Sequence, residues 1–270
     1  MVSFDVSGKV AVITGGAGIL CSVMAKELAE FGVKIALLDI DEKKASEIAA
    51  EINEKGGEAI GVGVDVLDMD SINKAKDIVM DRFGKVDILI NGAGGNKAAA
   101  TTGPSLSFFD IPQDALQWVV NLNLLGTIYV TQVFGKVMVD QNNGSVINIS
   151  SMSAYTPLTN TIAYSAAKAA ISNFTQWMSV HFAQEYSPNI RVNAIAPGFL
   201  HTTQNHFLLV DEKDNPTPRG KKIIAGTPMG RYGKPEELVG AIVYLCSDAA
   251  SFVTGSIIPI DGGYNAYSGV

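Results

Sequence analysis

The chain has 270 residues, of which 47% are hydrophobic and 17% are charged, and its formal net charge is −7 at pH 7. This length and apolar content suffice for one large core, and no linker-like stretch divides the chain, so we expect a single domain over residues 1–270. An acidic balance, with the lysines scattered among acids, argues against a nucleic-acid partner.

The cysteines and histidines narrow the kinds of functional site that we expect in this chain. The two cysteines, Cys21 and Cys246, stand far apart and in helical contexts, which indicates neither a disulfide framework nor a redox pair. The three histidines have no acidic partner at ligand spacing, so we predict no catalytic metal. The first residues lack a basic start followed by an apolar core, and no apolar run approaches ~20 residues, so we expect a cytoplasmic protein with no membrane span.

Short, almost wholly apolar runs alternate with longer helical patterns along the chain. Such strands are typical of a parallel sheet covered by helices on both faces, and the intervals suit right-handed crossovers. The sequence therefore predicts a doubly wound α/β fold with a mostly parallel, seven-stranded sheet. The expected strands are Val10–Thr14, Lys34–Asp39, Ala59–Val64, Val86–Asn91, Ser145–Ile149, Arg191–Ile195 and Ile257–Ile260.

A glycine-rich turn follows the first expected strand and opens a helix. Glycines let the backbone approach a pyrophosphate closely, and the helix start offers unpaired N–H groups and a positive dipole end. A tight turn without a ligand is the alternative. The candidate cofactor-binding residues of this turn are Gly15, Gly16, Gly18, Ile19 and Leu20.

The ends of the next strands add candidate cofactor contacts. Asp39 closes the second strand, where a carboxylate accepts ribose hydroxyls and repels a 2′-phosphate, which favours NAD over NADP. Alternatively, Asp39 caps the following helix. After the third and fourth strands stand Asp65 and Val66, suited to the adenine edge, and Asn91, Gly92 and Ala93, which leave room for the cofactor.

Two segments, about 92–112 and 199–230, are too long for plain connections. Each follows an expected strand, so each lies at the carboxyl edge of the sheet, where ligands bind in this architecture. We therefore expect them to face the substrate. Their polar side chains are Asn96, Lys97, His201, Gln204, Asn205, His206, Arg219, Lys221 and Lys222.

Tyr164 and Lys168 are four residues apart in an alanine-rich run, and Ser151 lies thirteen residues before the tyrosine. The spacing predicts that the phenol and the ammonium share one helix face, where the lysine lowers the pKa of the phenol. Alternatively, a tyrosine and a lysine at this spacing can arise by chance on an amphipathic helix and have no function.

Taken together, these pieces resemble the short-chain dehydrogenase/reductase family over almost the whole chain, which implies a single NAD(P)-binding Rossmann domain. Cys21 departs from the family pattern, because a last glycine commonly stands there, and we expect a slight adjustment of the packing. The matching residues are Gly15–Cys21, Asp65, Asn91–Gly94, Asn123, Ser151, Tyr164, Lys168, Pro197-Gly198, Arg231–Glu236 and Asp261–Gly263.

The resemblance implies a role for each catalytic position. Tyr164 corresponds to the general acid/base, Ser151 to the group that holds the substrate oxygen, and Lys168 to the ribose ligand. Asn123 corresponds to the support of a proton-relay water. At the nicotinamide end of the cofactor, the resemblance adds Pro197, Gly198, Leu200 and Thr202.

Within the family, the runs at 91–96, 149–158 and 173–177 look most like the D-mannonate oxidoreductase (fructuronate reductase) branch. This implies a sugar-acid substrate and interconversion of D-fructuronate and D-mannonate, while the resemblance to the family as a whole implies a homotetramer. Another polyol or keto-sugar-acid dehydrogenase, such as one for gluconate, and a catalytically silent NAD-sensing protein are the alternatives. The expected substrate-binding residues are Asn96, Lys97, Ser151, Ser153, His201 and Asn205.

The helix that carries the tyrosine has an aromatic stripe that includes Phe174, Trp177 and Phe182. Helical spacing of this kind predicts burial in the core first, and an oligomer interface second.

Overall fold

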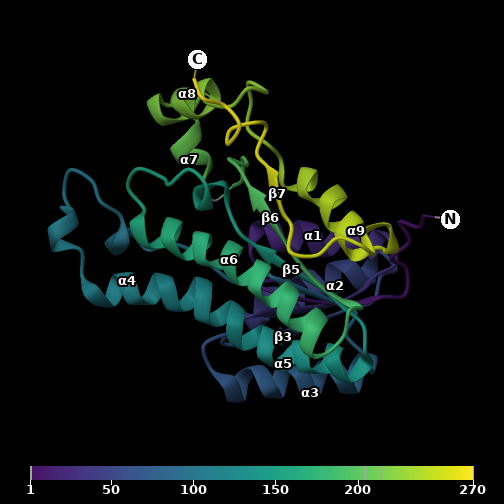
Figure 1. Cartoon of the computed structure of the whole chain (residues 1–270). Coiled ribbons are helices and arrows are strands. Elements are labelled where there is room, and N and C mark those ends of the chain that lie inside the picture. Colours follow the sequence, from purple (N-terminus) through teal and green to yellow (C-terminus); the bar gives the residue numbers. More distant parts are fainter. Residues whose placement is uncertain (1, 204, 214, 270) are drawn as a thin grey trace.

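The computed structural model describes residues 2–203, 205–213 and 215–269, so Gln204 lies outside the described residues. Its centre is one seven-stranded sheet in the order β3-β2-β1-β4-β5-β6-β7 (Figure 1). Every neighbouring pair of strands is parallel, which confirms the doubly wound fold. The strands are β1 (Val10–Thr14), β2 (Lys34–Asp39), β3 (Ala59–Gly63), β4 (Ile88–Asn91), β5 (Gly144–Ile149), β6 (Ile190–Pro197) and β7 (Ile257–Ile260).

Helices cover both faces of the sheet. One apolar cluster joins α1, α2 and α9 to one face, and a second joins α3, α5 and α6 to the other. The bounds are α1 (Ile19–Glu30), α2 (Glu42–Glu54), α3 (Met69–Phe83), α4 (Gln113–Val120), α5 (Gly126–Gln141), α6 (Ile162–Glu185), α7 (His206–Leu209), α8 (Pro218–Ala225) and α9 (Val239–Cys246).

The sheet has its topological switch point between β1 and β4. From β1 the chain crosses to β2 on one side and, after β3, returns to β4 on the other, so a crevice opens beyond their carboxyl ends. The Thr14 hydroxyl ties the two strand ends together, since it accepts hydrogen bonds from the N–H groups of Gly92 (3.1 Å) and Ala93 (3.2 Å).

Both long segments at this edge contain short helices of their own. Residues 92–112 include two single 3₁₀ turns, Ala98–Ala100 and Phe108–Asp110, while 199–230 includes α7 and α8. These two helices project beyond the end of the sheet together with the carboxyl-terminal segment (Figure 1).

Helices α4 and α5 run into each other through a π-helical turn, Asn121–Leu125. By length and composition, the resulting run Gln113–Gln141 could cross a membrane, but half of its most apolar window is buried inside the protein. Its α5 portion packs on β4 and β5, as a core helix does.

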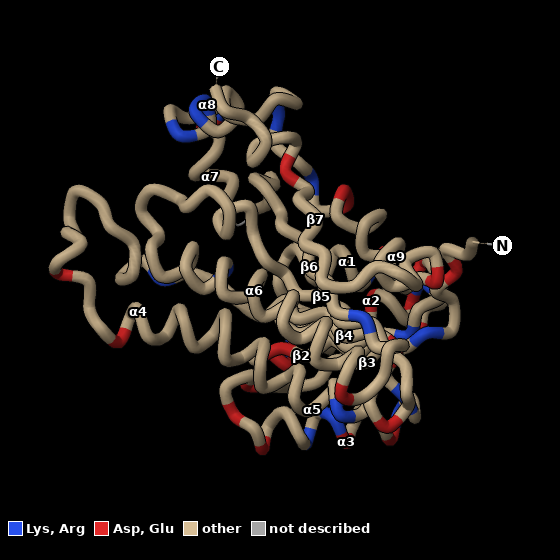
Figure 2. Tube along the Cα trace, viewed as in Figure 1, with Lys and Arg blue, Asp and Glu red and all other residues tan. Residues whose placement is uncertain are grey.

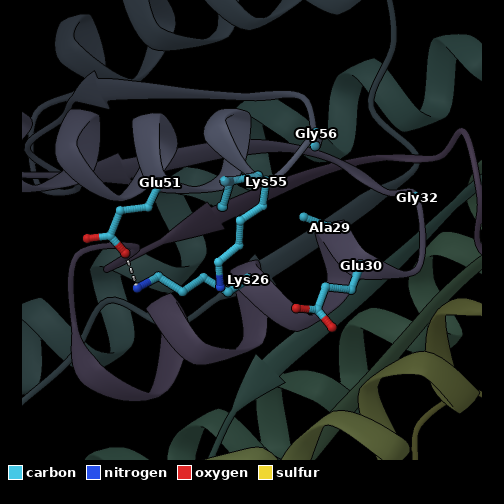
Figure 3. Close-up of a pocket in the computed structure, with 9 residues that line it drawn as sticks. Lys26, Ala29, Glu30, Gly32, Glu51, Lys55 and Gly56 are labelled. Carbon is cyan, nitrogen blue, oxygen red and sulfur yellow. Dashed lines mark hydrogen bonds and ion pairs between the residues drawn. The ribbon is translucent and has the colours of Figure 1, made fainter.

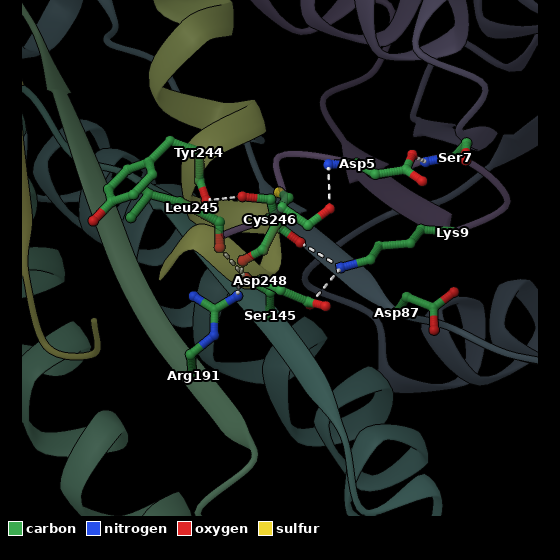
Figure 4. A network of polar contacts seen from close by, with 12 residues as sticks. Asp5, Ser7, Lys9, Asp87, Ser145, Arg191, Tyr244, Leu245, Cys246 and Asp248 are labelled. Carbon is green, nitrogen blue, oxygen red and sulfur yellow. Dashed lines mark hydrogen bonds and ion pairs between the residues drawn. The ribbon is translucent and has the colours of Figure 1, made fainter. Parts of the chain in front are cut away.

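The opposite, amino edge of the sheet carries a polar network around the end of α9 (Figure 4). The Lys9 ammonium donates to the carbonyl of Cys246 (2.7 Å), and an Arg191 guanidinium N–H donates to the carbonyl of Ser247 (3.3 Å). Cations at the carboxyl end of a helix satisfy carbonyls that have no helical partner. This network therefore fixes α9 against β1 and β6.

Candidate active site

Tyr164 and Lys168 lie one turn apart near the start of α6, as their spacing predicts. The Lys168 ammonium lies 5.6 Å from the centre of the Tyr164 ring and donates to the carbonyl of Ile149 at the end of β5 (2.8 Å). Ser151 follows the same strand, and its hydroxyl lies close enough to the phenol to influence its pKa. The end of β5 and the start of α6 thus bring the three side chains together.

The electrostatics of this group differ from the sequence prediction in one respect. Burial raises the pKa of the Tyr164 phenol above its ordinary value, and the hydrogen bond from Ser151 opposes that rise. Lys168 is not a source of the shift, so the prediction that it lowers this pKa is wrong. The lysine is itself desolvated, and burial lowers its pKa to about 8.

Asn123 lies in the π-helical turn and holds the loop that follows β4. Its amide donates to the carbonyls of Val119 (2.8 Å) and Gly95 (2.7 Å), and its Oδ1 accepts from the N–H of Gly95 (3.2 Å). A side chain at Gly94 would lie 2.6 Å from the Asn123 Oδ1 and 3.3 Å from the Lys168 ammonium. The loop, the asparagine and the lysine are therefore in immediate contact.

The glycine turn places backbone, not side chains, at the crevice. Gly15 has a φ of +63°, and a side chain there would lie 2.9 Å from the backbone of Ala93. Helix α1 begins at Ile19 with Gly18 as its N-cap and no capping side chain, so its first N–H groups have no helical partner. Such a turn fits the pyrophosphate of a dinucleotide.

Cys21 faces this turn from the first turn of α1, and it is buried. A side chain at Gly92 would lie 2.2 Å from the cysteine sulfur. The missing family glycine at position 21 is therefore compensated by the absence of a side chain at position 92, which agrees with the expected slight adjustment.

Asp39 reaches back to the glycine turn. One carboxylate oxygen accepts from the N–H of Ala17 (2.9 Å) and the other from that of Asp41 (3.0 Å). The N-cap of α2 is Asp41, which accepts from the N–H of Lys44 (3.1 Å), so the alternative that Asp39 caps this helix is wrong. Asp39 stands at the cofactor crevice, where its remaining lone pairs can accept ribose hydroxyls.

The other predicted cofactor contacts fall into two groups. Asp65 is exposed and Val66 buried just beyond β3. The Asn91 side chain lies in the core, where its amide donates to Thr131 (3.0 Å) and Asn148 (2.8 Å), so only its backbone faces the crevice edge. Its Oδ1 has no partner among the described residues.

Some of the residues that are predicted to contact the nicotinamide, at the end of β6 and just beyond it, are buried in the core. Pro197 and Leu200 are buried, and the Leu200 side chain packs in the apolar cluster of α1 and α9. Gly198 passes close to Asp261 and donates to the carbonyl of Ile260 (2.9 Å). Backbone atoms at Pro197, Gly198 and Leu200 therefore remain the groups that could contact a cofactor.

The loop after β6 is closed by Asn205, which the sequence predicts to contact the substrate. Its Oδ1 accepts from the N–H of Thr202 (2.9 Å), and its amide donates to the carbonyl of Leu200 (2.8 Å). Both polar ends of this side chain are thus engaged by the loop itself. His201, on the same loop, is exposed and stacks on His206 with a ring nitrogen contact of 2.9 Å.

The remaining predicted substrate residues lie on the other side of the crevice. The Asn96 amide donates to the hydroxyl of Thr101 (2.8 Å), and the Lys97 ammonium lies 4.8 Å above the centre of the Trp118 ring. Ser153 is buried, and its hydroxyl has no partner among the described residues. Trp118 also lies at this edge, yet it belongs to no motif that singles it out in the sequence.

A group of basic side chains lies on the short helix α8, beyond the end of the sheet. Helix α8 carries Arg219, Lys221 and Lys222 (Figure 2). The described residues contain no group of three or more metal-ligating side chains. A separate hollow of about 310 Å³ lies between α1 and α2, beside the Lys26–Glu51 ion pair (Figure 3). No predicted site residue lines it.

Comparisons with known proteins identify the family to which the chain belongs. A model of the enoyl-(acyl carrier protein) reductase family matches residues 17–265. The chain is 50% identical over 275 residues to an uncharacterised oxidoreductase, UxuB, of Bacillus subtilis, and the match covers 98% of each.

Two solved structures are also similar. One, from Haemophilus influenza, provisionally named a D-mannonate oxidoreductase and containing bound NAD, matches with a TM-score of 0.92 and 46% identity over 98% of each chain. The other, provisionally named a gluconate dehydrogenase, from Agrobacterium tumefaciens, matches with a TM-score of 0.87 and 30% identity over 99% of this chain and 100% of its own.

A Rossmann sheet with a dinucleotide turn, and a serine, a tyrosine and a lysine gathered at its carboxyl edge, define a nicotinamide-dependent oxidoreductase that acts on an alcohol or carbonyl group. The chain belongs to the short-chain dehydrogenase/reductase family.

Proposed function

We propose that this enzyme interconverts D-fructuronate and D-mannonate with NAD as its cofactor. The grouping of Tyr164, Lys168 and Ser151 at the ends of α6 and β5 carries the oxidoreductase chemistry. Similarity to a structure provisionally named a D-mannonate oxidoreductase, with bound NAD, supports the substrate and the cofactor. Lys97 on one substrate-facing segment and Arg219, Lys221 and Lys222 on the other offer cations to an anionic sugar acid.

Each catalytic residue of this chain has its own role in carbonyl reduction. When bound, the nicotinamide supplies the hydride. The Ser151 hydroxyl and the Tyr164 phenol donate hydrogen bonds to the substrate oxygen, which stabilise the negative charge that develops on it. Tyr164 then gives its proton to that oxygen, and it takes the proton back in the oxidation direction.

A raised pKa suits Tyr164 for the donor role, because the phenol stays protonated at neutral pH. Asn123 holds the loop of Gly94 and Gly95 against the Lys168 ammonium, and thereby fixes one wall of the crevice. In this proposal Asp39 accepts hydrogen bonds from an adenosine ribose and repels a 2′-phosphate.

The test is the steady-state rate of D-fructuronate reduction with NADH and with NADPH, beside 5-keto-D-gluconate and neutral D-fructose. We expect the highest kcat/KM for D-fructuronate with NADH. A higher kcat/KM for 5-keto-D-gluconate would show that D-fructuronate is not the preferred substrate. It would favour the gluconate-type alternative, which similarity to the Agrobacterium structure supports. NADH binding without turnover of any of the three would favour a silent NAD-sensing protein.

We further propose that the enzyme is a cytoplasmic homotetramer in which α6 packs against another copy. Trp177 is 57% exposed, so the prediction that it is buried in the core is wrong for a single chain. The outer face of α6 also presents Ile162 and Val180, and the helix is almost free of charge along its length (Figure 2). Two buried, free cysteines agree with a reducing compartment.

Light scattering after size exclusion measures this assembly. Trp177→Glu should lower the mass, because it places a charge on the apolar face, whereas Ile78→Glu, an exposed apolar position on α3, should not. A monomeric mass for the unmodified protein would contradict the tetramer.

A further inference from the structure

The Lys97 ammonium lies over the face of the Trp118 indole, 4.8 Å from the centre of the ring. Lys97 makes no ion pair with any carboxylate of the described residues. A cation–π contact holds an ammonium without neutralising its charge and leaves N–H donors available. The arrangement therefore presents a fixed and unpaired positive charge.

This charge stands on a loop that is tied to the catalytic residues. Two residues before Lys97, the backbone of Gly95 is clamped on both sides by the Asn123 amide, and Gly94 lies against the Lys168 ammonium. Beyond Lys97, the Thr101 hydroxyl donates to the Lys97 carbonyl (3.0 Å), which closes the turn.

The helix that carries the indole is also tied to the catalytic residues. Trp118 is 36% exposed on α4, next to Val119, whose side chain packs with Ala100 and Ala163 in a cluster that also contacts Tyr164. The carbonyl of Val119 accepts a hydrogen bond from the Asn123 amide (2.8 Å). Lys97 and Trp118 are thus both anchored through neighbours that touch the catalytic group.

We propose that Trp118 is a positioning residue that holds Lys97 over the substrate side of the crevice, where Lys97 receives the carboxylate of an anionic substrate. The inference rests on the proposed sugar-acid activity and adds the residue pair that selects the acid. A carboxylate that enters the crevice gains charge-assisted hydrogen bonds from an ammonium that has no competing anion. A neutral keto-sugar gains nothing from the pair.

The experiment compares KM and kcat for D-fructuronate and for neutral D-fructose at saturating NADH. Lys97→Gln should raise KM for D-fructuronate about tenfold, because the charge-assisted bond is lost, while KM for D-fructose stays unchanged. Trp118→Leu should raise KM for D-fructuronate about threefold, since the ammonium is no longer held. Lys97→Arg and Trp118→Phe should restore most of the affinity, and kcat should change little throughout.

Phe83→Leu is the matched control, because it removes another cation–π contact, that of Arg82 over the Phe83 ring at 5.1 Å, on the distant helix α3. It should leave both KM values unchanged. An equal rise for acid and neutral substrates in Lys97→Gln, or no rise in Trp118→Leu, would overturn the inference while leaving the sugar-acid activity intact. If the unmodified enzyme does not prefer acids over D-fructose, the proposed function itself fails, and this inference fails with it.

Discussion

The sulfur of Cys21 fills the space in front of Gly92, so that a side chain at Gly92 would lie 2.2 Å from it and 2.8 Å from the carbonyl of Thr14. These residues come from α1 and from the end of β4, and their contact closes the floor of the cofactor crevice at the switch point. In the family, a glycine commonly stands on the helix side of this contact. In this chain the helix side carries Cys21, and only Gly92, on the strand side, lacks a side chain.

Because of this contact, Gly92→Ala should destabilise the protein by about 1–3 kcal/mol, the ordinary effect of overpacking. Adding Cys21→Gly should recover part of the loss, since the Thr14 carbonyl still crowds the new methyl group. Urea unfolding of the single and double variants measures the coupling. Gly240→Ala is the control, because nothing lies within 4 Å of that position; additive effects at positions 21 and 92 would contradict the account.

Tyr164→Phe should lower kcat for carbonyl reduction by about 10²–10⁴-fold, because only the proton donor is lost. NADH affinity should change by less than about twofold, since the ring still packs in place. Stopped-flow turnover and NADH titration measure the two quantities. Tyr155→Phe is the control, because Tyr155 lies just beyond β5 and is 44% exposed. A large loss of NADH affinity in Tyr164→Phe would show that the phenol serves the cofactor and not the proton transfer.

The rate of reduction should fall as pH rises through about 8, where the buried Lys168 loses its proton. The sign follows from the chemistry: the protonated lysine offers a positive charge and three N–H donors to the cofactor, and the neutral lysine has lost the charge and one donor. Deprotonation of Tyr164 cannot cause this descending limb of the pH profile, because burial raises the pKa of its phenol above the ordinary value of 10.

The pH dependence of kcat/KM for NADH, which reports the cofactor-free enzyme, measures this limb. In Lys168→Arg the limb should move to higher pH, since a guanidinium keeps its charge there. A limb that stays near pH 8 in this variant would assign the titration to another group.

The sequence predicts the sheet well because its strands are apolar on both faces and end at polar or glycine residues. The predicted and observed bounds agree for Val10–Thr14, Lys34–Asp39 and Ile257–Ile260. The spacing of Tyr164 and Lys168 likewise predicts their shared helix face, because four residues are close to one helical turn.

What the sequence cannot give is the environment that distant segments create. The pKa of Lys168 depends on how deeply the ends of β4 and β5 bury it, and the contact of Cys21 with Gly92 joins segments that are remote in the chain. Periodicity marks Trp177 as apolar but does not tell whether the rest of the chain covers it. Asp39 and Asp41 are equal candidates for a helix cap until the hydrogen bond to Lys44 is seen.

Asp39→Asn should weaken NADH binding about tenfold and strengthen NADPH binding, because it removes a charged acceptor of ribose hydroxyls and the repulsion of a 2′-phosphate. The amide keeps the size of the side chain and one oxygen for the hydrogen bond from Ala17. Dissociation constants for both cofactors, from fluorescence titration, measure the change. Asp41→Ala is the matched control: it removes the true cap of α2, so it should lower stability by about 1 kcal/mol and leave the cofactor preference unchanged. If Asp39→Asn keeps the preference of the unmodified enzyme, the carboxylate only braces the glycine turn, and another residue selects the cofactor.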